Sequence, residues 1–142
     1  MRILVAVDGS KGSLRAVQSV IEHADWYRRK PEVHLVAVHL PVPKLPRMGL
    51  AVGKSQIARY YAEEGAAMLA ASRRKLDAAR IPHRAQVLVG PIAETLVKYA
   101  REARCDLIVI GTRGMTAIGK ALVGSTATKV LHIADRPVLL VR

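Results

Sequence analysis

Three glycines and two hydroxyl residues near the end of the chain are spaced as in a phosphate-binding loop. The pattern is Gly111-x2-Gly114-x9-Gly124-Ser125-Thr126, and it follows the short apolar run 107–110. Glycines let backbone N–H groups approach an anion with no Cβ in the way, and the N–H groups at a helix start receive it. A strand, a glycine loop and a helix start in this order predict a phosphate site. The alternative is an ordinary flexible loop.

Residues that would carry other chemistry are not arranged for it. The segment 114–121 has Walker A spacing but ends in Ala121, where a hydroxyl should hold Mg²⁺, and the segment 49–55 is one residue short. The five histidines form no i, i+4 pair and have no cysteine partner, so no metal site is expected. No G-x-S-x-G elbow and no paired carboxylates suggest hydrolysis. We therefore expect no catalytic residues, and a binding protein rather than an enzyme.

The length and composition predict one domain over residues 1–142 with an aliphatic core. At 142 residues the chain is long enough to bury a core without disulfides or metal, and it has no Phe. Its single cysteine, Cys105, excludes an intrachain disulfide and fits a reducing compartment. The start has too few apolar residues for a signal peptide, and no run is long enough to span a membrane. We expect a cytoplasmic protein with no membrane partner.

The formal net charge of +12 raises the question of nucleic acid. The basic residues are dispersed, however, and the densest clusters are 28–30 and 73–75. Aromatic residues suited to base stacking are scarce, and none lies on a predicted strand face. A solvated basic surface is the simpler interpretation, so nucleic acid is not expected as a partner. The same charge favours an anionic ligand.

Apolar runs alternate with helical patterns along the chain. Continuous apolar runs predict buried strands, and apolar residues at helical spacing predict helices. Ser10 is the expected N-cap of the first helix and Pro91 is expected in the first turn of the third. The proline- and glycine-rich stretch 41–54 is expected to be a surface loop. The predicted strands are 2–8, 33–40, 83–89, 107–110 and 137–141, and the predicted helices are 13–27, 55–79, 91–103 and 125–133.

This alternation predicts an α/β fold: an open parallel sheet of five strands with helices on both faces. Ligands of such sheets lie at the carboxyl ends of the strands, where the strand order reverses. Asp8 and Gly111 both follow a predicted strand and so belong to that edge. The sequence pattern alone leaves the order of the strands open.

The chain resembles the single-domain universal stress proteins, in their ATP-binding branch. The resemblance is carried by the segments 3–10, 38–40, 103–114, 124–126 and 136–142. It covers the whole chain except the loop 41–54, and the glycine pattern matches at every defining position. It implies a Rossmann-like fold, similar to the adenine nucleotide alpha hydrolases, with strand order 3-2-1-4-5.

The resemblance also implies a division of roles among the site residues. Asp8 and nearby backbone, including Val7, would hold the ribose and base region, and Leu40 would face the adenine. The phosphates would be surrounded by Gly111, Arg113, Gly114, Gly124, Ser125 and Thr126. Thr126 is expected to contact the phosphates through its backbone and not through its side chain. Arg113 would add charge-assisted hydrogen bonds.

Two functions of different class follow. The favoured one is a stress-response module that binds ATP, with or without Mg²⁺, and acts through conformation or assembly rather than turnover. The alternative is a slow ATPase or another enzyme of adenine nucleotides. Whether ATP, ADP or AMP is the resident ligand stays open. The apolar last strand, 137–141, is expected at the sheet edge, where an antiparallel pairing of two copies would form a homodimer.

Overall fold

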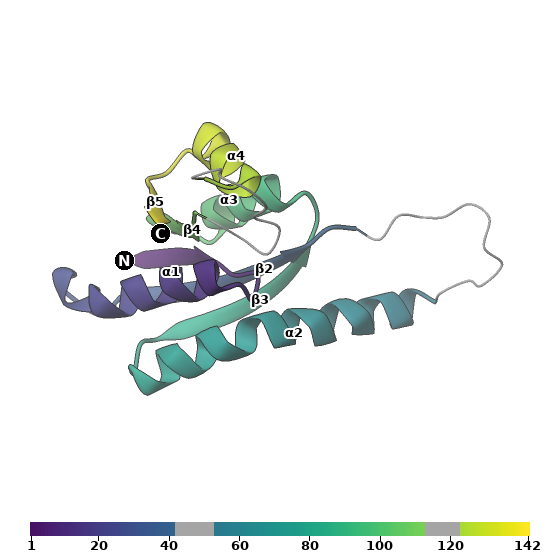
Figure 1. Cartoon of the computed structure of the whole chain (residues 1–142), viewed down its shortest axis with the longest axis horizontal. Helices are drawn as coiled ribbons and strands as arrows, with labels where there is room; N and C mark the ends of the chain where they lie inside the picture. Colours follow the sequence, from purple (N-terminus) through teal and green to yellow (C-terminus); the bar gives the residue numbers. More distant parts are fainter. Residues whose placement is uncertain (42–52, 113–122) are drawn as a thin grey trace.

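The computed structural model describes residues 1–41, 53–112 and 123–142, and five parallel strands alternate there with helices (Figure 1). Every expected strand is present. The strands are β1 (Arg2–Ala6), β2 (Glu32–His39), β3 (His83–Val89), β4 (Leu107–Gly111) and β5 (Val138–Val141). The α-helices are α1 (Lys11–Glu22), α2 (Lys54–Ala78), α3 (Ile92–Glu102) and α4 (Ser125–Ile133), and a short 3-10 helix, η1 (Ala24–Trp26), follows α1.

The five strands form one sheet in the order β3-β2-β1-β4-β5, as the resemblance implied. All pairings are parallel: Val5 of β1 lies opposite Leu35 of β2 and Val109 of β4. The order reverses at β1, because β2 and β3 extend to one side of it and β4 and β5 to the other. The carboxyl ends of β1 and β4 therefore meet at the point where such sheets bind ligands.

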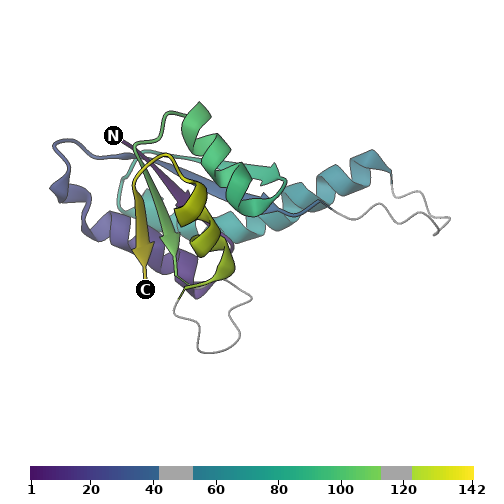
Figure 2. The same cartoon turned by 90° about the horizontal axis from the view of Figure 1, so that it is seen from above.

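The helices form two layers, one on each face of the sheet (Figures 1 and 2). One core joins α1 and α2 to residues such as Val5 and Leu35, and the other joins α3 and α4 to residues such as Leu4 and Val36. Because both faces are covered, β1 buries four successive residues instead of alternating. The core is aliphatic, as the absence of Phe requires.

The first helix is shorter than predicted at its carboxyl end, stopping at Glu22 rather than Tyr27. The ring of His23 folds back so that its Nδ1 lies 2.7 Å from the Ser19 carbonyl oxygen, which also accepts the His23 N–H. Helix hydrogen bonding ends there, and η1 turns the chain toward β2. At the other end Ser10 is the N-cap, as expected, and its hydroxyl accepts the Ser13 N–H at 3.1 Å.

Candidate nucleotide site

Four of the expected binding residues lie at one edge of the sheet, at the ends of three neighbouring strands. Leu40 directly follows β2, Val7 and Asp8 follow β1, and Gly111 ends β4. The adjacent order β2-β1-β4 places these carboxyl ends side by side. The two helices that begin at this edge on either side of it, α1 and α4, start at Lys11 and Ser125.

The loop after β1 is a tight turn built by Asp8. Its carboxylate oxygen Oδ1 accepts the Ser10 N–H at 3.0 Å, and Gly9 between them has a φ of +79°, a left-handed conformation suited to glycine. The turn holds Ser10 in position to cap α1. Asp8 therefore has a role in shaping the loop, whatever it contributes to ligand binding.

Gly111 makes a close backbone contact with the first turn of α1. A Cβ built on Gly111 would lie 2.6 Å from the carbonyl oxygen of Gly12 and 2.7 Å from its carbonyl carbon. Real Cβ atoms do not come that close to backbone, so only glycine fits. The contact brings the start of α1 against the end of β4. The lack of a side chain at Gly111 thus serves helix–strand packing.

Gly124 is different, because the described residues around it leave room for a Cβ. That atom would lie 3.4 Å from the Thr112 carbonyl oxygen, which is ordinary contact. Gly124 is the N-cap of α4, with an extended backbone (φ −72°, ψ 158°), and its N–H donates to the Thr112 carbonyl at 2.7 Å. This bond ties the start of α4 to the end of β4.

The amide groups in the first turn of α4 are directed to the same edge without a protein acceptor. Gly124 supplies no capping side chain, and the N–H groups of Ser125, Thr126 and Ala127 have no acceptor within the described part of the chain. The Thr126 N–H is one of these three groups. Unsatisfied donors at a helix N-terminus, with the positive end of the helix dipole, attract anions.

Leu40 projects from the end of β2 with 62% of its surface exposed. Its carbonyl oxygen accepts the Tyr61 hydroxyl of α2 at 3.4 Å. The preceding His39 is buried and its ring lies 5.4 Å from the Tyr61 ring. The backbone beside Leu40 is thus anchored to α2, while its side chain offers an apolar surface.

The other expected site residues are Val7, Arg113 and Gly114. The Val7 side chain is buried in the core and its N–H donates to the Val36 carbonyl, so a ligand contact would use its carbonyl oxygen. Arg113 and Gly114 lie outside the described residues. Sequence reasoning missed Gly12 and Thr112, which join α1 and α4 to the end of β4. A glycine directly before the predicted helix 13–27 was the available signal of a close backbone approach.

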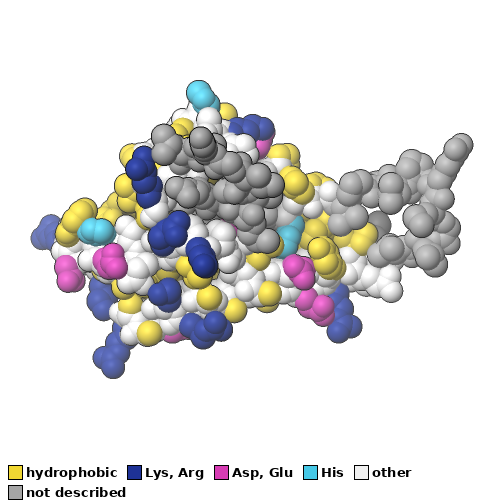
Figure 3. Space-filling view, in the orientation of Figure 1, with side chains coloured by type: hydrophobic (Ala, Val, Ile, Leu, Met, Phe, Trp, Pro, Cys, Tyr) yellow, Lys and Arg dark blue, Asp and Glu magenta, His cyan; other side chains and the backbone are white. Residues whose placement is uncertain are grey.

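The described residues show no sign of metal or thiol chemistry. No group of three or more His, Cys, Asp or Glu side chains in the described ranges is placed to hold a metal ion. Cys105 is fully buried, and burial raises the pKa of its thiol, which opposes thiolate formation. Lys and Arg side chains are spread over the face seen in Figure 3, in agreement with the expected dispersed basic surface.

Comparison with known proteins identifies the class. The model of the universal stress protein family matches residues 1–142, so the chain belongs to this family. Universal stress protein MJ0531 of Methanocaldococcus jannaschii is 32% identical over 99% of this chain and 81% of its own length. The family implied by the glycine pattern is thereby confirmed.

Solved structures confirm the fold. Protein MJ0577 superposes with a TM-score of 0.82 at 23% identity, covering 99% of this chain and 94% of its own. The universal stress protein of Archaeoglobus fulgidus in complex with dAMP superposes with a TM-score of 0.68 at 26% identity, covering 100% and 98%. Among the described residues of the present chain, no helix is both long and apolar enough to cross a membrane.

Proposed function

We propose that this chain binds an adenine nucleotide, ATP first of all, at the carboxyl ends of β2, β1 and β4. It would do so as a single-domain, cytoplasmic stress-response module that does not turn the nucleotide over. The observation that carries the proposal is the first turn of α4, where the N–H groups of Ser125, Thr126 and Ala127 have no acceptor in the described part of the chain. Three adjacent amide donors at a helix start suit a phosphate.

The layout of the edge supports a nucleotide rather than a free phosphate. Leu40, at the end of β2, offers an apolar side chain to a base. Asp8, one strand along, has a carboxylate that accepts hydrogen bonds, as ribose hydroxyl groups require. The α4 amide groups lie beyond β4. Base, ribose and phosphates would thus lie across three consecutive strand ends, with Gly111, Arg113 and Gly114 completing the phosphate loop.

A second helix N-terminus adds to the attraction for phosphate. The N–H groups of Lys11 and Gly12 at the start of α1 also have no acceptor among the described residues. Gly12 contacts Gly111, so α1 begins against the end of β4. The positive ends of both helix dipoles therefore favour negative charge at this edge.

A relative supports the chemical class of the ligand. The Archaeoglobus fulgidus universal stress protein, 26% identical over the whole chain, was solved in complex with dAMP. That complex concerns an adenine nucleotide with one phosphate. We extend this to the present chain, and prefer ATP over ADP or AMP, because five amide groups without an acceptor among the described residues lie at the starts of α1 and α4.

The testing experiment is calorimetric titration with ATP, ADP and AMP, each with and without Mg²⁺. We expect affinity to fall as phosphates are removed, and ATP to be recovered intact after the titration. Gly124→Val should abolish measurable ATP binding while circular dichroism and the melting temperature stay close to those of the parent protein. Unchanged ATP affinity in this variant would remove the phosphate site from α4. Rapid release of ADP would favour the alternative, an ATPase.

A further inference from the structure

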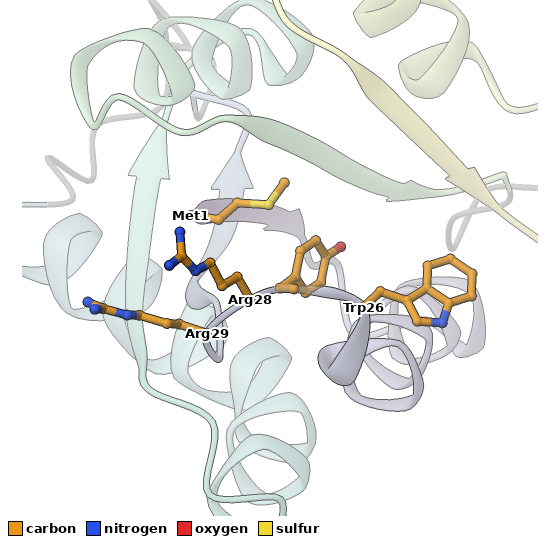
Figure 4. A pocket seen from close by; sticks show the side chains of 5 residues that line it. Met1, Trp26, Arg28 and Arg29 are labelled. Atoms are coloured by element: carbon orange, nitrogen blue, oxygen red, sulfur yellow. The ribbon is translucent and has the colours of Figure 1, made fainter.

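A cavity lies at the opposite edge of the sheet, where β1 begins. It has a volume of about 350 Å³ and is lined by Met1, Trp26, Tyr27, Arg28 and Arg29. Figure 4 shows the Trp26 indole at one end of this lining and the guanidinium groups of Arg28 and Arg29 at the other, with Met1 on the side of the arginines. A stacking surface and a pair of cations thus flank one hollow.

Trp26 is unusually exposed for its type. It has 78% of its surface accessible to solvent, although Trp side chains are on average well buried. Its position is defined by η1 and by the ring of His23, whose centroid lies 4.0 Å from that of the indole. Tyr27 packs partly against the core and keeps the segment attached to the fold. The indole is therefore presented to solvent by an ordered support.

Of the three basic residues that follow, Lys30 has a structural role, and Arg28 and Arg29 are available to a ligand. Lys30 directs its ammonium group to the carbonyl oxygens of Ala79 and Arg80, at 3.5 and 3.4 Å, and so caps the carboxyl end of α2. Arg28 and Arg29 are exposed and form no ion pair or hydrogen bond within the described part of the chain. Their guanidinium groups remain available to an anion.

We propose that this edge binds single-stranded nucleic acid, with a base stacked on Trp26 and phosphates on Arg28 and Arg29. Aromatic side chains beside a basic groove are the recurring features of such sites, and the planar guanidinium suits phosphate oxygens. The net charge of +12 is spread over the chain. A charge distributed in this way favours a long polyanion as the partner over a protein with a small acidic patch. A lipid bilayer is less suited to a hollow than to a protruding apolar surface.

This proposal departs from the expectation that nucleic acid is not a partner. That expectation rested on dispersed cations and on the absence of aromatic residues from strand faces. The aromatic residue used here lies instead on a 3-10 helix, next to the arginines in sequence and across the cavity from them in space. The site is separate from the carboxyl edge and does not depend on nucleotide binding there.

The experiment uses the only tryptophan of the chain as its reporter. An oligo(dT) of about ten nucleotides, which carries no adenine, is titrated into the intact protein at low salt. We expect quenching of Trp26 fluorescence, an affinity that falls steeply with added salt, and the same affinity in saturating ATP. Vesicles of anionic lipid and poly-glutamate, tested in parallel, should leave the emission wavelength and intensity unchanged.

Variants separate this site from general charge attraction. With anisotropy of labelled oligo(dT) as the readout, Trp26→Ala and the double variant Arg28→Ala/Arg29→Ala should each weaken binding about tenfold. Arg73→Ala/Arg74→Ala is the matched control, because it removes two adjacent exposed arginines from α2. Equal losses in the two double variants, displacement by ATP, absence of quenching, or a blue shift with vesicles would each overturn the proposal.

Discussion

Gly111 and Gly12 are in backbone contact, which brings the end of β4 against the first turn of α1. A Cβ on Gly111 would lie 2.6 Å from the Gly12 carbonyl oxygen. Two helix N-termini therefore flank the β1–β4 edge: α1 through this contact, and α4 through the bond from the Gly124 N–H to the Thr112 carbonyl. The proposed phosphate site depends on both connections.

The two glycines of this edge should respond differently to substitution. Gly111→Ala forces its methyl group into backbone that cannot rotate away, so it should lower the free energy of unfolding by about 2–3 kcal/mol. Gly124→Ala meets only an ordinary contact among the described residues and should cost less than about 1 kcal/mol as a change of N-cap. Urea unfolding of both variants measures this. Equal stability of the two would contradict the close contact at Gly111.

Asp8 should show separable structural and ligand effects. Asp8→Asn keeps a carbonyl oxygen that can accept the Ser10 N–H, whereas Asp8→Ala loses it. We expect stability close to that of the parent protein for Asp8→Asn and a loss of about 1 kcal/mol for Asp8→Ala. If the carboxylate also binds ribose, both variants should weaken ATP while leaving inorganic phosphate less affected. Calorimetry with the two ligands decides, and a parallel loss for both ligands would leave Asp8 with the loop role alone.

His34 should make the protein less stable in mild acid. Burial lowers the pKa of His34; the Glu32 carboxylate opposes this shift and Arg84 adds to it. The His34 Nδ1 lies 3.0 Å from the Tyr99 hydroxyl and its Nε2 lies 3.5 Å from Glu32 Oε1. Because the unfolded chain binds the proton more readily, stability is complete above the ordinary histidine pKa of about 6.5 and falls as the pH drops toward the folded value.

The slope from this single group is at most about 1.4 kcal/mol per pH unit. Urea unfolding between pH 7 and pH 5, in steps of about half a unit, measures it. His34→Gln should flatten the slope, and His132→Gln, an exposed change on α4, should leave it as it is. A slope that survives in His34→Gln would assign the acid sensitivity to another group. Glu32, the carboxylate beside His34, titrates at lower pH than the histidine. Desolvation raises the pKa of Glu32, but the hydrogen bond and charge of Arg84 outweigh this and hold the pKa below its usual value.

β5 should form the contact between two copies. Within the described sheet it is the edge strand next to β4, and Leu139 on it is 43% exposed. An unpaired apolar edge favours pairing with another strand. Leu139→Lys should convert a dimer to a monomer in light scattering, whereas Val89→Lys, a similarly exposed change on the opposite edge strand β3, should not. A monomeric mass for the parent protein at micromolar concentration, with and without ATP, would refute the dimer.

Local pattern was enough to predict the five strands and the four α-helices that the structure describes, because the strands are mostly apolar and the helices carry apolar residues at helical spacing; the short helix η1 was not predicted. The strand order came from family resemblance, since pairing between distant segments leaves little trace in any one of them. The sequence also placed Asp8 and Gly111 at one edge, and Gly124 at the start of a helix. The sequence did not indicate that position 111 must be glycine because the Gly12 backbone packs against it, or that the Thr112 carbonyl holds the start of α4. Both features depend on contacts between segments that are separated in the sequence.

The boundary of α1 shows a second limit of local reasoning. The apolar pattern continues to Ala24, but the helix ends at Glu22, and His23 is its C-cap with both its N–H and its ring Nδ1 on the Ser19 carbonyl. The η1 turn that follows presents Trp26 to solvent beside Arg28 and Arg29. In sequence these residues read as the basic end of a helix. Only the fold places them around a cavity.

The most direct measurement of the central claim is the map of backbone amide chemical shifts during titration with ATP. If the nucleotide binds at the carboxyl edge, the largest changes should fall on the amide groups of Ser125, Thr126 and Ala127, with smaller changes at Lys11 and Gly12. The amide groups around Trp26, at the other edge, should stay unchanged. Saturable binding with shifts clustered away from the starts of α4 and α1, or no shifts at millimolar ATP, would contradict the proposed site.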